Sequence, residues 1–133
     1  MANISPQDMQ QIVTNPERAD LVVKYADLLG QELSRTLNTS QIRALFGEVR
    51  QIEGQMTVDH TTAWRRLHLL KPKMAYRVRR AQGAGVRGLV EVLNPAVDEV
   101  LKAKDEETQK KYFKHFVEFF EAILAYHKYH GGN

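Results

Sequence analysis

Apolar residues recur at intervals of three to four positions through most of the chain, which is the spacing of amphipathic helices. No segment shows the strict alternation of apolar and polar residues that indicates a half-buried strand. The sequence therefore predicts an all-α fold, a compact bundle of about five to six helices. The expected helices cover about residues 15–35, 40–54, 59–71, 73–81, 86–103 and 104–130.

A polar stretch at residues 1–14 precedes the first clear helical pattern, and nothing later in the chain marks a domain boundary. We therefore expect residues 1–14 to form a loose N-terminal lead-in and residues 15–133 to form a single helical domain. The total length of 133 residues fits one domain of ordinary size.

Capping residues and prolines set the expected helix boundaries. Asn15 followed by a proline is typical of a helix start, and residues 38–40 (Asn-Thr-Ser) offer a hydroxyl cap for the next helix. Pro72 and Pro95 lie within apolar helical patterns. Because proline lacks a backbone donor and clashes with the preceding turn, we expect Pro72 to end or restart its helix. For the same reason the residue before Pro95 is expected to mark a kink or a break.

The predicted last helix carries two neighbouring apolar stripes that together cover roughly half of its circumference, wider than the ~100° stripe of a surface helix. We interpret the first stripe as the centre of the bundle. The second stripe fits either internal packing or a surface for a partner subunit. The first stripe is Phe113, Phe116, Val117, Phe120 and Leu124, and the second is Tyr112, Phe119, Ile123 and Tyr126.

A stripe of small and basic residues runs along the predicted helix at residues 40–54. It consists of Arg43, Gly47, Arg50 and Gly54, spaced at three to four positions. Small residues let another backbone come close, so the stripe favours helix–helix packing within the fold. The alternative is that another chain approaches this face.

Composition excludes several kinds of site. The chain has no cysteine, which rules out disulfide scaffolds, thiolate zinc sites, iron–sulfur clusters and cysteine nucleophiles. The N-terminal residues lack the basic and apolar regions of a signal peptide, and no apolar run reaches the roughly 20 residues of a membrane span. We expect a soluble, cytoplasmic protein that has no membrane partner.

Basic residues are concentrated in the middle of the chain. Residues 43–87 hold ten Lys and Arg against three Asp and Glu, whereas the net charge of the whole chain is only +3. From Arg65 to Arg87 there are eight bases and no acid. Such asymmetry indicates a surface that binds a polyanion. The basic residues of this stretch are Arg43, Arg50, Arg65, Arg66, Lys71, Lys73, Arg77, Arg79, Arg80 and Arg87.

Tyr76 lies among bases in the predicted helix at residues 73–81. Lys73, Arg77 and Arg80 recur there at helical spacing, beside the stripe that is expected to face the core. An aromatic ring among cations is typical of proteins that stack or clamp single-stranded nucleic acid, so Tyr76 joins the candidate binding residues. The alternative is that Tyr76 packs against another helix and the arginines are only solvated. No base-reading motif accompanies this segment, so we expect phosphate contacts without sequence preference.

Signals for catalysis and for metal binding are weak. Residues 83–88 match the G-x-G-x-x-G pattern but follow no predicted strand, so we interpret them as a turn and not as a dinucleotide site. His127 and His130 are three residues apart, as two metal ligands on one helix can be, but no third ligand accompanies them in sequence. We interpret both as packing or helix-end residues. The chain is predicted not to be an enzyme, with no catalytic residue, no cofactor and no metal.

Three segments, in this order, resemble a known family. They are LNTSQIRALFGEV at residues 37–49, LLKPKMAYRVRR at residues 69–80 and FFEAILAYHKY at residues 119–129. Together they resemble the small subunit of the type III-A CRISPR effector, the Csm complex. Arg43 lies in the first segment, and the second contains Lys71, Lys73, Tyr76, Arg77, Arg79 and Arg80.

The resemblance implies a non-catalytic, RNA-binding subunit of a type III-A CRISPR interference complex in antiviral and anti-plasmid defence. Its expected partners are the guide (CRISPR) RNA, the target RNA, the backbone and large subunits of the complex, and neighbouring copies of itself. Several copies are expected to stack along the guide–target duplex and hold the target strand by its phosphates, since pairing with the guide supplies the sequence specificity. Two other hypotheses stay open: a free-standing helical DNA-binding regulator, and an adaptor that binds proteins through its aromatic last helix.

Overall fold

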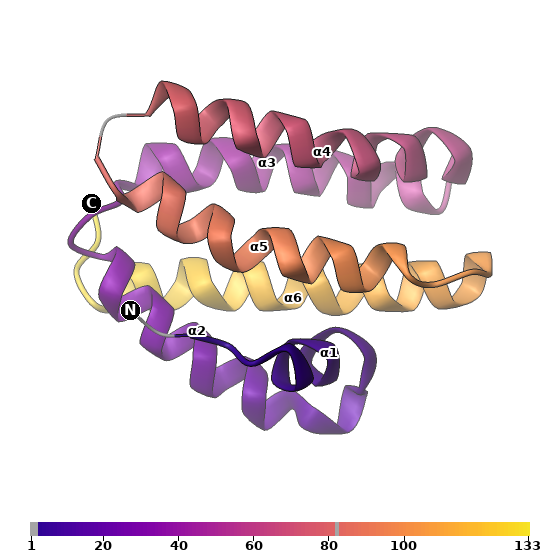
Figure 1. Cartoon of the computed structure of the whole chain (residues 1–133), viewed down its shortest axis with the longest axis horizontal. Coiled ribbons are helices and arrows are strands. Elements are labelled where there is room, and N and C mark those ends of the chain that lie inside the picture. Colours follow the sequence, from indigo (N-terminus) through magenta and orange to yellow (C-terminus); the bar gives the residue numbers. More distant parts are fainter. Residues whose placement is uncertain (1–2, 82) are drawn as a thin grey trace.

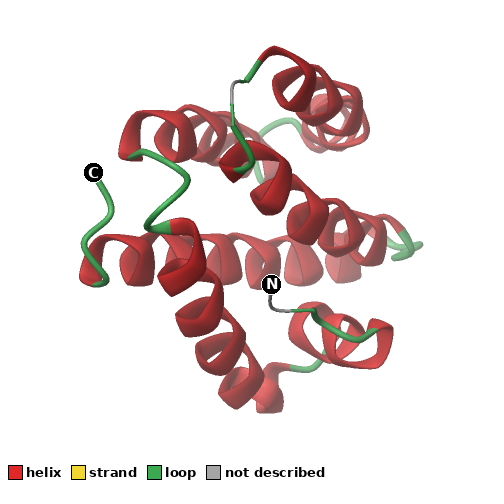
Figure 2. Ribbon diagram, turned by 60° about the vertical axis from the view of Figure 1, so that its left-hand side comes forward, coloured by secondary structure: helices red, strands yellow, loops and turns green. Residues whose placement is uncertain are grey.

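The computed structural model describes residues 3–81 and 83–133, and all regular secondary structure in this part of the chain is helical. Its α-helices pack around a shared core (Figure 1; Figure 2). The prediction of an all-α bundle is confirmed. The helices are α1 (Pro6–Thr14), α2 (Ala19–Leu33), α3 (Thr39–Met56), α4 (His60–Arg80), α5 (Gly85–Leu101) and α6 (Glu106–Tyr129), and a 3₁₀ turn covers Pro16–Arg18.

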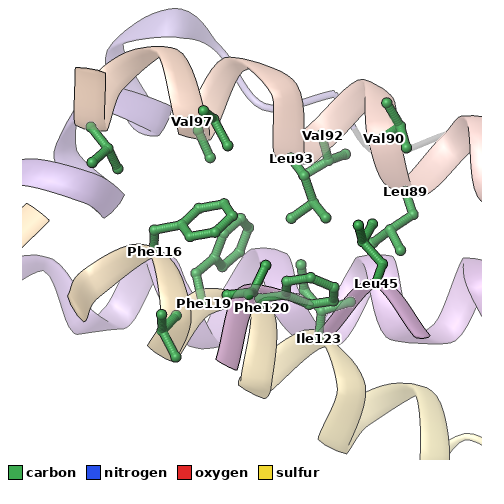
Figure 3. Close-up of a cluster of buried hydrophobic side chains, with 14 of the residues drawn as sticks. Leu45, Leu89, Val90, Val92, Leu93, Val97, Phe116, Phe119, Phe120 and Ile123 are labelled. Atoms are coloured by element: carbon green, nitrogen blue, oxygen red, sulfur yellow. The ribbon is translucent and has the colours of Figure 1, made fainter. Parts of the chain in front are cut away.

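Helix α6 lies at the centre of the bundle. It contacts α1, α2, α3 and α5, so other helices cover most of its circumference. Figure 3 shows Phe116, Phe119 and Phe120 of α6 opposite apolar side chains of α5, and all three are fully buried. The interpretation of the first apolar stripe as the centre of the bundle therefore fits the structure.

The second apolar stripe of α6 packs within the chain as well. Phe119 and Ile123 are fully buried, and Tyr112 and Tyr126 are half-buried against the same core. Of the two readings that the sequence left open for this stripe, the structure supports internal packing.

Gly30 allows α2 to approach α6 closely. A Cβ atom at this position would lie 2.5 Å from Cβ of Tyr126 and 2.6 Å from the backbone nitrogen of His127. Backbone atoms inside a helix cannot move aside alone, so any larger residue at Gly30 must push the two helices apart. In the same region, Nε2 of the buried His127 donates a hydrogen bond to the carbonyl oxygen of Leu37 at 2.5 Å, which ties the α2–α3 connection to α6.

The first helix, α1, was not predicted. Met9, Ile12 and Val13 are buried in the common core, and the hydroxyl of Tyr25 on α2 donates a hydrogen bond to Oδ2 of Asp8 at 2.5 Å. This hydrogen bond and burial raise the pKa of Tyr25. The expectation of a loose lead-in is wrong over α1, because three apolar positions in one short helix make a repeat too brief to stand out in sequence.

Both internal prolines lie inside continuous helices. Pro72 is within α4 and Pro95 is within α5. Neither helix ends at its proline, so the prediction that Pro72 ends or restarts its helix is wrong, and no break occurs before Pro95. Each proline ring is exposed, while neighbouring side chains such as Leu70, Met74 and Leu93 are buried. Packing on both sides of the proline thus holds each helix across the missing hydrogen bond.

The cap of α3 also differs from the expected one. Asn38, and not a hydroxyl of the following two residues, is the N-cap: its Oδ1 accepts from the backbone N–H of Gln41 at 2.8 Å. The Gln41 side chain accepts in return from the Asn38 N–H at 3.1 Å, which completes a capping box. Asn15 does cap a helical segment, but that segment is the 3₁₀ turn that leads into α2.

The small and basic stripe of α3 faces solvent. Arg43, Gly47, Arg50 and Gly54 are all exposed, and a Cβ atom at either glycine would meet nothing within 4 Å. The interpretation of this stripe as a helix–helix contact within the fold is therefore wrong. The alternative, that another chain approaches this face, stays a prediction.

Two glycine substitutions test how α2 and α6 pack. Gly30→Ala is expected to lower the free energy of unfolding by about 1–3 kcal/mol, because the new methyl group overlaps the backbone of α6. Gly47→Ala is the matched control in an exposed helix position, and it should raise stability by about 0.5–1 kcal/mol through helix propensity. Urea unfolding followed by circular dichroism measures both. Equal effects of the two substitutions would show that α2 and α6 are not in this close contact.

Candidate nucleic-acid interface

The predicted binding residues lie on three consecutive helices. Helices α3 and α4 are joined by a short turn and run antiparallel beside each other, and α4 also contacts α5 (Figure 1). The fold therefore brings the basic stretch of the sequence onto neighbouring helices. Arg43 and Arg50 belong to α3, Arg87 belongs to α5, and α4 carries Arg65, Arg66, Lys71, Lys73, Tyr76, Arg77, Arg79 and Arg80.

Arg66 holds α4 against α3. Its guanidinium donates hydrogen bonds to Glu48 at 2.6 Å and to Gln51 and Gln55 at 2.9 Å each, and all three acceptors are on α3. Nζ of Lys73, about two turns further along α4, lies 3.3 Å from the same carboxylate oxygen of Glu48. The side chain of Arg66 is therefore committed to the contact between the two helices.

Two more of the predicted cations have acidic partners. Lys71 pairs with Asp98 and so joins α4 to α5. Arg50 lies 2.8 Å from Glu53, one turn along α3, and its guanidinium is also 5.7 Å from the ring centre of Phe46. Because exposed pairs of this kind are weak and open easily, Arg50 keeps much of its capacity to bind an external anion.

The remaining arginines form no ion pair with any residue in the described ranges. Arg65 and Arg79 show the arrangement most clearly: both are exposed, and their spacing of fourteen residues is nearly four helical turns. They therefore share the outward face of α4, roughly 21 Å apart along its axis. The arginines of this group are Arg43, Arg65, Arg77, Arg79, Arg80 and Arg87.

Tyr76 is directed to solvent. Its side chain is 61% exposed, so the alternative that it packs against another helix is wrong. The guanidinium carbon of Arg80 lies 5.7 Å from the centre of the Tyr76 ring, within the range of a cation–π contact. The pair offers a flat aromatic ring and a planar cation side by side, which are the two groups that proteins use to stack against nucleobases.

A groove of about 650 Å³ opens beside Tyr76, where α3, α4 and the start of α5 meet. Lys73, Arg77 and Arg80, the stripe that the sequence indicated, all border it together with Tyr76. Its other lining residues are Gln41, Leu45, Glu48, Pro72, Ala81, Val86 and Leu89. The groove thus combines apolar side chains from all three helices with a basic border.

Among the described residues that line this groove, Glu48 is the one carboxylate. Burial raises the pKa of Glu48, but hydrogen bonds from Arg66 and Lys73 and the charges of those two residues outweigh burial, so the pKa lies below its ordinary value of 4.5. Glu48 is therefore ionised at neutral pH, and its charge is offset by the two cations. The net charge that the border of the groove presents to solvent is positive.

Sequence reasoning missed Glu48 and the apolar part of the groove. The sequence does contain a weak indication of Glu48. A helical hairpin that turns near residue 58 places position 48 close to position 66 on the partner helix, and this spacing suggests the pair with Arg66. No signal of this kind exists for Leu45, Val86 and Leu89. They look like ordinary core positions until the three helices are placed.

The histidines flagged in the sequence have separate partners. Nε2 of His127 is bonded to the Leu37 carbonyl, while Nε2 of His130 lies 2.6 Å from Oδ1 of Asp27. Within the described ranges no group of three or more His, Cys, Asp or Glu is placed to hold a metal ion. The G-x-G-x-x-G segment follows α4 and runs into the first turn of α5, so it is not preceded by a strand.

Comparison with known proteins gives one family. The family model described as Csm2 Type III-A matches residues 16–133, nearly the whole chain. No curated protein and no solved structure matches the chain. In the described part of the chain, none of the helices combines the length and the apolar character required to cross a lipid bilayer.

The pH dependence of stability tests the role of Glu48. Because the folded pKa of Glu48 is lowered, its contribution is fully present above pH 4.5 and is lost as the pH falls through the folded pKa. Glu48→Gln should therefore cost about 1–2 kcal/mol at pH 7, and the difference from the wild type should shrink as the pH falls below 4.5. Chemical unfolding between pH 3 and pH 8 measures this difference.

The matched control is Glu118→Gln. Glu118 is an exposed glutamate on α6, so its substitution should change stability by less than about 0.5 kcal/mol across the same pH range. A stability difference for Glu48→Gln that does not vary with pH would contradict the assignment of Glu48 as the anion that joins α3 to α4.

Proposed function

The chain belongs to the Csm2 family of type III-A CRISPR systems, and from that premise we propose that it binds RNA within the effector complex. Family membership makes it a structural subunit of that complex. The proposal is that the outward surface of α3, α4 and the start of α5 lies along the guide–target duplex. There it holds the target strand by its phosphates, without reading the bases and without catalysis.

The observation that carries this proposal is the division of the cations into two groups. Cations that face a neighbouring helix, such as Arg66 and Lys71, are neutralised by carboxylates. Cations on the outward face, such as Arg65 and Arg79, have no acidic partner in the described residues. An unpaired cationic surface of this extent repels itself and lowers stability, and a bound polyanion would relieve this repulsion.

The surface of α3 supports the same proposal. Its exposed positions between Arg43 and Arg50 are Ala44 and Gly47, and Gly54 follows one turn later. Because Gly47 has no side chain and the space above it is open, a nucleic-acid backbone can approach α3 there closely enough for both guanidinium groups to reach phosphates. The exposed Arg87 at the start of α5 extends the surface beyond α4.

Other subunits and other copies complete the proposed setting. We propose that several copies stack along the duplex, next to the backbone and large subunits, and that the complex acts in the cytoplasm. The hypothesis of a free-standing DNA-binding regulator gains no support from the family match, and no observation on the described helices favours it.

A double substitution on the outward face tests RNA binding. Arg65→Ala/Arg79→Ala should weaken binding of unrelated RNA sequences by similar factors, because phosphate contacts carry no sequence information. The dependence of log affinity on log salt concentration should become shallower by about 1.5–2, since two fewer counterions are released. Fluorescence anisotropy with two labelled RNAs of different sequence, at several salt concentrations, measures both effects.

Lys111→Ala/Lys114→Ala on α6 removes the same charge from exposed positions outside this surface. This control should leave the salt slope close to that of the wild type. If the two double variants lower affinity and slope equally, binding depends only on net charge, and the α3–α4–α5 surface is not the RNA site.

A further inference from the structure

Resting on the proposed function, we propose that the groove between α3, α4 and α5 binds one unstacked nucleotide of RNA. The base would lie against the apolar wall, and the adjoining phosphates would contact the arginines at the border. The surface would then use two kinds of contact: phosphates along the outward face of α4, and a single base in the groove.

The floor of the groove comes from α3 and α5, where Leu45, Val86 and Leu89 are only 2%, 8% and 1% exposed. The apolar wall that is open to a ligand belongs to α4: Pro72 is exposed, Ala81 is half-buried, and the ring of Tyr76 is exposed. Because the groove forms where three helices converge, it is a local hollow. A helical peptide needs anchor residues spread over about two turns, or roughly 10 Å, and a long groove between two helices suits it better.

The size of the groove fits a small ligand. Its volume of about 650 Å³ lies within the range of about 300–1,000 Å³ that is usual for small-molecule and cofactor sites. A nucleotide is a ligand of this size. It combines a flat, largely apolar ring with a phosphate, and these match the apolar wall and the basic border respectively.

The border supplies cations and a stacking surface at one edge. Lys73, Arg77 and Arg80 follow each other at intervals of four and three residues, which puts them on one side of α4. Tyr76 lies next to them with its ring exposed, and the Arg80 guanidinium is 5.7 Å from that ring. An acidic peptide would be attracted by the cations but would gain little from the exposed ring, so this chemistry favours a nucleotide.

Glu48 does not repel such a ligand. Its Oε2 atom already accepts hydrogen bonds from Arg66 at 2.6 Å and from Lys73 at 3.3 Å. The two cations offset its charge, and Arg77 and Arg80 have no acidic partner among the described residues. The phosphate of a bound nucleotide therefore meets a net positive border.

The test compares two ligands of the same length and charge. One is a short single-stranded RNA, and the other is a matched oligomer with abasic sites in place of the bases. Both present the same phosphates, but only the first presents bases. The full-length wild-type chain should bind the RNA about tenfold more tightly than the abasic oligomer, which is the scale of one stacked base.

Ala81→Trp fills the groove without changing its charge. Ala81 lines the groove, and its extended backbone, with φ −72° and ψ 145°, is one that Trp also adopts. This variant should bind the RNA about tenfold more weakly than the wild type, so the preference over the abasic oligomer disappears. Its affinity for the abasic oligomer should be unchanged. Ala125→Trp, at an exposed position on α6, should keep the preference.

Tyr76→Ala is a second variant that does not touch the core, because the ring is exposed. It should reduce the preference for RNA over the abasic oligomer while leaving the thermal unfolding temperature unchanged. Tyr76→Ala therefore tests the groove even if Ala81→Trp fails to fold.

The possible outcomes separate the groove from the proposed function. In one outcome the wild type binds both oligomers, and both Tyr76→Ala and a folded Ala81→Trp keep its full preference for the RNA. The groove is then not a nucleotide site, but phosphate binding stands. If the wild type binds neither oligomer, both proposals fail. If Ala81→Trp keeps the preference for RNA but no longer assembles with the purified subunits of the complex, the groove takes a protein segment and the nucleotide proposal is overturned.

Discussion

Helix α6 is apolar over an unusually large part of its circumference, and this determines where the helices that contact it lie. Its four phenylalanines and Ile123 are all buried and lie on more than one side of the helix. Each such side chain contributes about 1.5–3 kcal/mol when it is fully removed from water. Helices α1, α2, α3 and α5 therefore pack around α6, and α4 packs on α3 and α5. The positions of α1, α2, α3 and α5 follow from the need to cover one unusually apolar helix, and α4 is placed by its contacts with α3 and α5.

The packing of the helices determines which side chains of α4 face its neighbours and which face solvent. Packed between α3 and α5, it turns one side to the core and the opposite side to solvent. Its inward-facing cations meet Glu48 and Asp98, which hold the three helices in register. Its outward cations have no acidic partner in the described chain. The same basic segment thus contributes to stability through one set of side chains and offers a polyanion-binding surface through another.

Most of the fold could be predicted because each long helix carries a regular apolar stripe. The misses have physical causes. Helix α1 is too short for its period to stand out, and Pro72 and Pro95 sit inside helices that packing holds together across the lost hydrogen bond. At the two prolines, tertiary contacts override local propensity.

The candidate site could be predicted only in part. The run of basic residues located the surface, because charge asymmetry is visible in sequence alone. It could not separate Arg66 from Arg65, since the two are adjacent and differ only in which helix they face. That difference depends on the register of α3 against α4. The floor of the groove depends in addition on the placement of α5, which no local pattern encodes.

The central claim is that the outward arginines bind RNA by its phosphates. The most direct measurement is NMR of the arginine Nε–Hε groups of the full chain, titrated in turn with two RNA duplexes of unrelated sequence. Both duplexes should shift the same signals, those of Arg43, Arg65, Arg79 and Arg87 among them, and should leave the signal of Arg18, which pairs with Asp20 before α2, unchanged. Shifts that spread evenly over all arginines, or that move to different arginines with each duplex, would contradict it.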